Sequence, residues 1–156
     1  MTAKSATTKR WTSRMGCTFT VLLPQSTPVT TMRLPEDDEN YLNEKGFDWE
    51  LQPDGQWGIL VIKGYPISGV KYDRKNTDLM IRIPPQYNNA ALDMFYADPP
   101  VQLKNGGFPN RADQFENHGG HRWQRFSRHL SKPWRPGIDS LPGFLSLISR
   151  EIQSDD

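Results

Sequence analysis

The chain has 156 residues, which is a typical length for one domain and enough to bury about two thirds of the surface exposed by the unfolded chain. Lys and Arg number 19 against 18 Asp and Glu, so the near-zero net charge argues against a protein built mainly to coat nucleic acid. A single cysteine, Cys17, excludes an internal disulfide and a cysteine-based zinc site.

Residues 1–30 are rich in Thr, Ser and basic residues and show neither helical nor strand periodicity, which predicts a flexible N-terminal arm. Within it, a short strand over 17–29 is a further prediction, interrupted by two prolines. The domain proper is expected over 31–156. We find no apolar run of the roughly 20 residues that span a bilayer and no apolar leader, and therefore expect a soluble cytoplasmic protein without a membrane partner.

The domain begins with a predicted helix over 35–45, where Pro35 suits the first turn and Gly46 the end. Three segments of strand composition come next, at 47–55, 56–67 and 78–84, separated by polar turns, and predict an antiparallel meander. An extended segment with aromatic anchors is expected between the prolines at 84–100, and a loop over 104–120.

Asp139 or Ser140 can cap a C-terminal helix. Its apolar residues recur at helical spacing on one face, which should close the core: Leu141, Phe144, Leu145, Ile148 and Ile152. The predicted fold class is therefore α+β, with an N-terminal helix, an antiparallel meander, an irregular segment that carries the chemistry, and a C-terminal helix.

The irregular segment at 117–141 concentrates all three histidines, two tryptophans and several arginines. One interpretation is a nucleic-acid site, with bases stacked on aromatic side chains between cations, although core aromatics and solvated arginines explain the pattern as well. A second is a metal site of His118, His121 and His129 with Asp113 or Glu116, although loop histidines more often form hydrogen bonds.

A third interpretation is a nucleophile at Ser127. A serine hydroxyl needs a neighbouring base and donors that stabilise the oxyanion, and His129 or a loop histidine can serve as the base. A serine two residues from a histidine is common, however, so local chemistry leaves the three interpretations open.

The order of elements, the sequence WQRFSRH at 123–129, and Trp134-Arg135-Pro136 followed by Asp139-Ser140-Leu141 resemble the ubiquitin-conjugating (UBC-like) family. They are most similar to a divergent bacterial branch encoded beside a ubiquitin-like protein, an activating enzyme and often a metallopeptidase. The resemblance spans about 34–152.

The family places its acceptor cysteine seven to nine residues before the Trp-x-Pro, a position that here holds Ser127. The resemblance implies that the chain carries a ubiquitin-like protein on Ser127 as an oxyester and transfers it to a target, with His129 or His121 as the acid. The family's oxyanion asparagine has a counterpart in Asn110, with Asn117 as a rival.

The resemblance also gives the cations Arg122, Arg125 and Arg128, together with Trp134, a role in binding the partner. The expected partners are the ubiquitin-like protein, the activating enzyme and, within the same pathway, the metallopeptidase, without a cofactor or metal. A rival is a catalytically inactive UBC-like scaffold. Cys17 is the alternative nucleophile, although a small buried residue is its commoner role.

Overall fold

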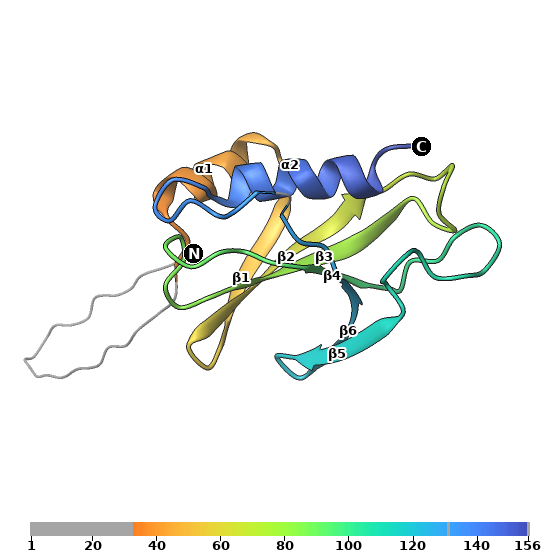
Figure 1. Cartoon of the computed structure of the whole chain (residues 1–156), viewed down its shortest axis with the longest axis horizontal. Helices are drawn as coiled ribbons and strands as arrows, with labels where there is room; N and C mark the ends of the chain where they lie inside the picture. The colour runs from red at the N-terminus through yellow and green to blue at the C-terminus, as the bar shows by residue number, and fades with distance from the viewer. Residues whose placement is uncertain (1–32, 131, 156) are drawn as a thin grey trace, which may run out of the picture. The chain divides into compact units, whose positions relative to one another are not determined.

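The computed structural model describes residues 33–130 and 132–155. The predicted arm, its strand and Cys17 lie outside these residues. Two helices and six strands succeed one another along the described chain (Figure 1): α1 (Glu36–Glu44), β1 (Asp48–Asp54), β2 (Trp57–Pro66), β3 (Asn76–Ile83), β4 (Phe95–Asp98), β5 (Gln114–His118), β6 (His121–Phe126) and α2 (Leu141–Ile152).

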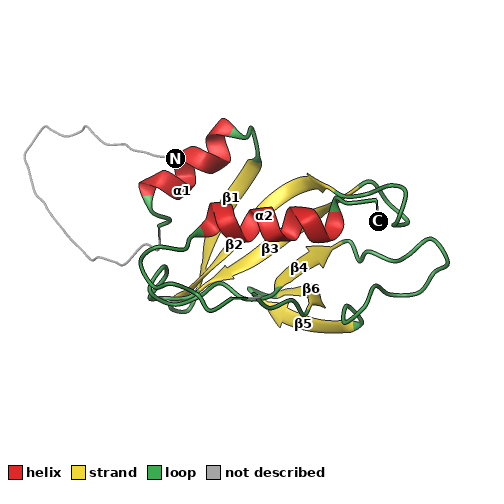
Figure 2. Ribbon diagram, turned by 45° about the horizontal axis from the view of Figure 1, so that its top comes forward, coloured by secondary structure: helices red, strands yellow, loops and turns green. Residues whose placement is uncertain are grey.

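The six strands form one antiparallel sheet in the order β1-β2-β3-β4-β6-β5. Its first three strands are the predicted meander. Both helices lie on the same face of the sheet (Figures 1 and 2), and the predicted α+β class is confirmed. Neither of the two helices in the described part of the chain is long and apolar enough to cross a membrane.

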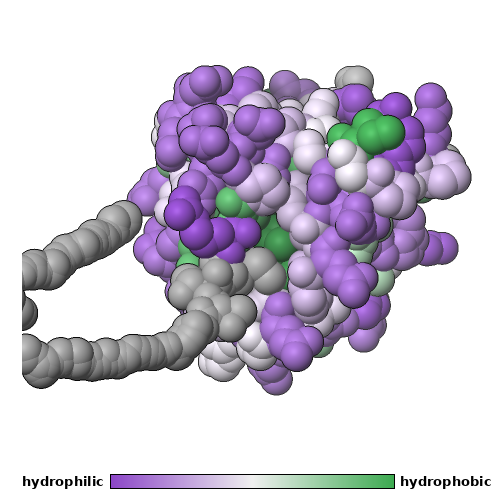
Figure 3. Space-filling view, turned by 90° about the vertical axis from the view of Figure 1, so that its left-hand side faces the viewer, coloured by the Kyte–Doolittle hydropathy of each residue, from purple (hydrophilic) through white to green (hydrophobic). Residues whose placement is uncertain are grey.

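Alternation along β2 divides the apolar side chains between the two faces of the sheet, because successive residues of a strand point to opposite sides. Leu60 and Ile62 join the main core beneath the helices, whereas Ile59 and Val61 belong to a smaller cluster on the other face. The smaller cluster is completed by Met80, Tyr96 and Trp123. Viewed from the side in Figure 3, hydrophilic residues cover most of the surface and a few hydrophobic ones lie between them.

The two helices are joined through Tyr87, in the extended segment before β4. Its hydroxyl donates to the buried Asp38 carboxylate on α1 (2.6 Å) and accepts from the Leu141 N–H at the start of α2 (2.6 Å). Ser140 is the N-cap residue of α2 but makes no side-chain capping bond. The Tyr87 hydroxyl instead accepts the hydrogen bond from the Leu141 N–H, the first of the helix. The five predicted apolar residues of α2 are all buried.

The prediction of a loop over 104–120 is wrong in part, because its second half is β5, which pairs with β6 from Gln114↔Arg125 to His118↔His121. Gly119 and Gly120 form the turn between the strands, both with positive φ (61° and 76°). The segment expected to be irregular, 117–141, likewise contains the end of β5 and the whole of β6. The polar composition of β5 concealed the hairpin, which is recognisable only from its partner strand.

Gln124 holds the long connection between β4 and β5 against the sheet. Its buried side-chain amide donates to the carbonyls of Val101 (3.0 Å) and Ala112 (2.8 Å), while its carbonyl oxygen accepts from the Val101 N–H (2.7 Å). One side chain thus replaces the strand pairing that these backbone groups lack. The segment around Ala112 is thereby fixed beside the end of β6.

We expect Gln124→Leu to lower the free energy of unfolding by about 2 to 4 kcal/mol, because one buried N–H and two buried carbonyls lose their partner at once. Gln114→Leu, on an exposed position of β5, is the matched control and should change it by less than about 0.5 kcal/mol. Urea denaturation of both variants measures the difference. Equal stability of the two would contradict the anchoring role of Gln124.

Candidate functional site

Ser127 is the first residue after β6, and buried aromatic packing fixes its position. Phe126 stacks on its cross-strand partner Phe95, with ring centroids 4.8 Å apart and planes at 13°. Ser127 itself is partly exposed, and its N–H donates to the carbonyl of Arg111 (3.0 Å). The hydroxyl therefore sits at the edge of the core on a firmly held backbone.

Two non-glycine residues in the described part of the chain, Arg111 and Met94, have left-handed backbone conformations. Arg111 bonds to the backbone of Ser127, and Met94 bonds to the backbone of Arg128. Arg111 (φ 55°) supplies the carbonyl that accepts from Ser127, and the N–H of Met94 (φ 60°) donates to the Arg128 carbonyl (3.1 Å). Such conformations cost energy and concentrate at functional sites. Their convergence marks the stretch after β6 as the candidate site.

His129 lies two residues beyond Ser127 and pairs with Asp93, at 2.9 Å between Nδ1 and Oδ1. Both side chains are about half exposed. With Nδ1 facing a carboxylate, Nε2 is left as the nitrogen that can exchange a proton with another group. Nothing in the local sequence singles out Asp93, which lies 36 residues earlier in the chain.

His121, the second predicted acid, lies at the other end of β6, where its Nε2 is 2.7 Å from the Asp98 carboxylate. Ser127 lies six positions farther along the extended chain, or about 20 Å away. The structure therefore does not bring His121 and Ser127 together. Distance along the sequence was misleading because the segment is a strand and not a folded loop.

Asn110 is exposed and adjoins Arg111, the residue whose carbonyl bonds to Ser127. The β5–β6 hairpin lies between Asn110 and Ser127 in the sequence. The bond from the Ser127 N–H to the Arg111 carbonyl brings the two ends of this stretch together. Asn117, in contrast, pairs with Arg122 near the turn of the hairpin. Of the two rival asparagines, the fold places the Asn110 segment beside Ser127.

The three arginines expected to form one partner surface lie in three different places. Arg122 stacks over the ring of Phe115 (4.1 Å), whereas Arg125 bonds to Glu116 on the opposite face of the hairpin (2.7 Å). Arg128 is largely buried. Alternate residues of β6 point to opposite faces of the sheet, so Arg122 and Arg125 lie on different faces, and Arg128 follows the strand.

Arg128 connects the candidate site to the C-terminal helix. Its guanidinium pairs with Glu151 through two contacts (3.0 and 3.3 Å) and also donates to the Ser127 carbonyl (3.2 Å). A guanidinium engaged in this way on a carboxylate holds the backbone next to Ser127 and has little capacity left for a partner. It acts as a support for the site.

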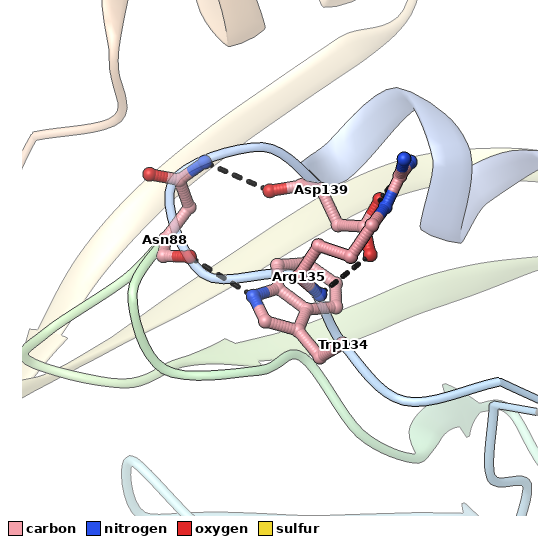
Figure 4. Close-up of polar contacts among 4 residues, drawn as sticks. All are labelled: Asn88, Trp134, Arg135 and Asp139. Carbon is pink, nitrogen blue, oxygen red and sulfur yellow. Dashed lines mark hydrogen bonds and ion pairs between the residues drawn. The ribbon is translucent and has the colours of Figure 1, made fainter.

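Trp134 is also held by the chain itself (Figure 4). Its indole N–H donates to the carbonyl of Asn88 (2.9 Å), which also accepts from the Gly137 N–H, while the Asn88 side chain donates to the Asp139 carbonyl (2.8 Å). Arg135 pairs with the Asp139 carboxylate (2.7 Å). Asn88 thus closes the loop before α2, a role that its residue type alone does not reveal.

Beside this loop lies a groove of about 390 Å³ against α2. Its apolar side chains include Leu130, Trp134 and Phe144, and Lys132 and Arg150 add positive charge. Neither of these two cations contacts an acid in the described part of the chain. The groove is therefore a candidate basic surface in the segment that follows Ser127 along the chain.

The nucleic-acid and metal interpretations lose their structural basis. Trp123 and Phe126 are buried in the two apolar clusters and cannot stack on bases. His118 bonds to Glu116 near the hairpin turn, whereas His129 lies beyond the other end of β6. Within 33–130 and 132–155, no three His, Cys, Asp or Glu side chains are grouped closely enough to hold a metal ion.

Glu116 organises the outer face of the hairpin. Burial pushes its pKa up, but hydrogen bonds from His118 (2.8 Å), Arg125 (2.7 Å) and Tyr96 (3.0 Å) favour the carboxylate more strongly and hold the pKa below its ordinary value. Burial and the neighbouring Glu116 charge raise the pKa of Tyr96 to about 12. The ionised form of Glu116 is therefore the form that stabilises the folded chain.

A lowered pKa in the folded state gives stability that is present above the pKa of the unfolded chain and is lost as the pH falls through the folded value. At about pH 7 we expect Glu116→Gln to be about 1 to 2 kcal/mol less stable than the parent chain, with the difference vanishing in acid. Urea denaturation across the acid range tests this. Glu50→Gln, an exposed control 3.7 Å from Lys63, should show almost no such dependence.

A search of known families matches residues 34–155 to a family described as "Prokaryotic E2 family E". The match covers most of the chain and the whole candidate site, and it leaves out Cys17. No curated protein and no solved structure matches the chain.

Proposed function

Because the chain belongs to the prokaryotic E2 family E, with an E2-like role in a ubiquitin-like conjugation pathway, we propose that Ser127 accepts the ubiquitin-like protein as an oxyester. The observation that carries the proposal is the convergence of both strained residues, Arg111 and Met94, on the backbone at Ser127 and Arg128. The matched region contains no cysteine, so an acceptor within it must use another nucleophile. The partly exposed Ser127 hydroxyl meets that requirement.

In the loading step, the Ser127 oxygen attacks the carbonyl carbon of the C-terminal glycyl thioester on the activating enzyme. The C–S bond breaks, the enzyme's thiolate leaves, and the serine proton passes to His129 Nε2. Asn110, beside the Arg111 carbonyl, is the proposed donor to the oxyanion of the tetrahedral intermediate. The Arg128–Glu151 pair keeps the nucleophile's backbone in place.

In the transfer step, an amine or hydroxyl of the target attacks the same carbonyl carbon and the C–O bond to Ser127 breaks. An alkoxide is a poorer leaving group than a thiolate, so protonation of the departing oxygen matters more than in a cysteine enzyme. His129 is the proposed acid, because His121 is about 20 Å away. We further propose that the activating enzyme and the ubiquitin-like protein belong to a pathway that also includes a metallopeptidase.

The proposal predicts the adduct's chemistry when the chain is incubated with its cognate activating enzyme, the ubiquitin-like protein and ATP. The adduct should survive thiol reductant, yield to mild alkali and disappear in Ser127→Ala. Ser127→Cys, a matched variant, should give an adduct that reductant cleaves. Gel separation with and without each treatment measures these outcomes.

Other results would contradict the assignment in different ways. An adduct that reductant cleaves in the parent chain and that is lost in Cys17→Ala would identify Cys17 as the nucleophile. Binding of the ubiquitin-like protein without any adduct, in the parent chain and in Ser127→Cys alike, would identify the chain as the inactive UBC-like scaffold.

A further inference from the structure

The Asp93–His129 pair has the arrangement that activates a serine in hydrolytic enzymes. A carboxylate that accepts from Nδ1–H holds the imidazole in the tautomer whose Nε2 is an acceptor. That nitrogen can then take the proton of a nearby hydroxyl. Two serines lie two residues from His129 in the sequence, Ser127 and Ser131, and of these Ser127 is among the described residues.

The backbone around the pair is well defined. Met94, which follows Asp93, donates its N–H to the carbonyl of Arg128, which precedes His129. This bond lies immediately beside the Asp93–His129 contact, just beyond the last pair of β4 and β6, Phe95↔Phe126. Arg128 pairs with Glu151 of α2 and lies over the Phe126 ring. Adjacent side chains of an extended chain point to opposite sides, so Ser127 and His129 are expected to face away from α2 together.

We propose that Ser127, His129 and Asp93 form a proton relay, and that the relay gives the chain a further activity: acyl transfer from small activated esters to Ser127, followed by hydrolysis, with no protein donor. The proposal rests on the proposed role of Ser127 as the acceptor. Asp93 acts as a positioning residue, because it reaches the reacting atoms only through His129.

The chemistry of this activity balances without a cofactor. As Ser127 Oγ bonds to the ester's carbonyl carbon, its proton moves to His129 Nε2 and the C–O bond to the aryl group breaks, releasing the phenolate. The imidazolium gives that proton to the solvent, and water then attacks the acyl-serine carbonyl and gives a proton to the freed Nε2. His129 returns that proton to Oγ as the C–O bond breaks, and the carboxylic acid leaves.

The chain supplies its own control in the Asp98–His121 pair at the other end of β6. The carboxylate–imidazole distance there is 2.7 Å and the histidine exposure is similar, 54% against 56% for His129. No serine lies within two residues of His121, where the chain reads Gly119, Gly120, Arg122 and Trp123. Asp98→Asn therefore removes the same kind of contact without touching the relay.

The probe is p-nitrophenyl acetate, with released p-nitrophenolate followed by absorbance and the acyl group located by peptide mass spectrometry. We expect an acetyl group on Ser127 and acylation that falls about 100-fold or more in His129→Gln. Asp93→Asn should lose about tenfold or more, Asp93→Glu should recover part of the rate, and Asp98→Asn should match the parent chain. The pH dependence of acylation should flatten in His129→Gln alone.

A second measurement separates positioning from simple folding. Nitrogen-15 NMR of the imidazoles reports which nitrogen carries the hydrogen. Asp93→Asn should move the His129 hydrogen away from Nδ1 and leave His118 and the fold unchanged. An unaltered His129 tautomer, or an acylation rate independent of His129, would overturn the relay.

The outcomes distinguish the relay from the proposed function. Serine adducts with the ubiquitin-like protein, but no relay-dependent acetylation by the ester, would preserve Ser127 as the acceptor and reject the relay. Relay-dependent acetylation of Ser127 without any adduct from the activating enzyme would establish the relay and reject the protein donor.

Discussion

The pairing of β4 with β6 is the constraint on which the candidate site depends. It brings together two stretches about thirty residues apart, with Phe95 stacked on Phe126 in the core. The chain leaves this pairing at Ser127 on one strand, while Met94 precedes it on the other. Ser127, the proposed acceptor, and the His129–Asp93 pair beside it owe their positions to these few residues, because a stacked aromatic pair in a close-packed core resists displacement.

The support around this pairing is polar and comes from distant parts of the chain. Gln124 fixes the connection that carries Arg111, and Glu151 of α2 holds Arg128. Burying such groups is favourable only when each finds its partner. The site is therefore held by the sheet, the long connection and the C-terminal helix together.

The sequence alone predicted the elements whose signal is local. The N-terminal helix, the meander and the apolar face of α2 follow from turn residues and periodicity, and the structure confirms them. The β5–β6 hairpin escaped because its residues are mostly polar and its two-glycine turn resembles an ordinary loop. Asp93, Asn88 and Gln124 escaped because their partners lie far along the chain, and residue type alone does not reveal such contacts. The places of Arg125 and Arg128 likewise depend on their ion-pair partners, Glu116 and Glu151, which residue type alone does not reveal.

The two faces of strand β6 differ in how freely their residues can be substituted during evolution. Gln124 and Phe126 point to the core beneath the helices, whereas Trp123 and Arg125 lie on the opposite face of the sheet. Arg125 is partly exposed, so its substitution can change the charge of that face without touching the residues that hold the backbone at Ser127. Gln124 and Phe126 have no such freedom, because each is buried and fixes a neighbouring segment.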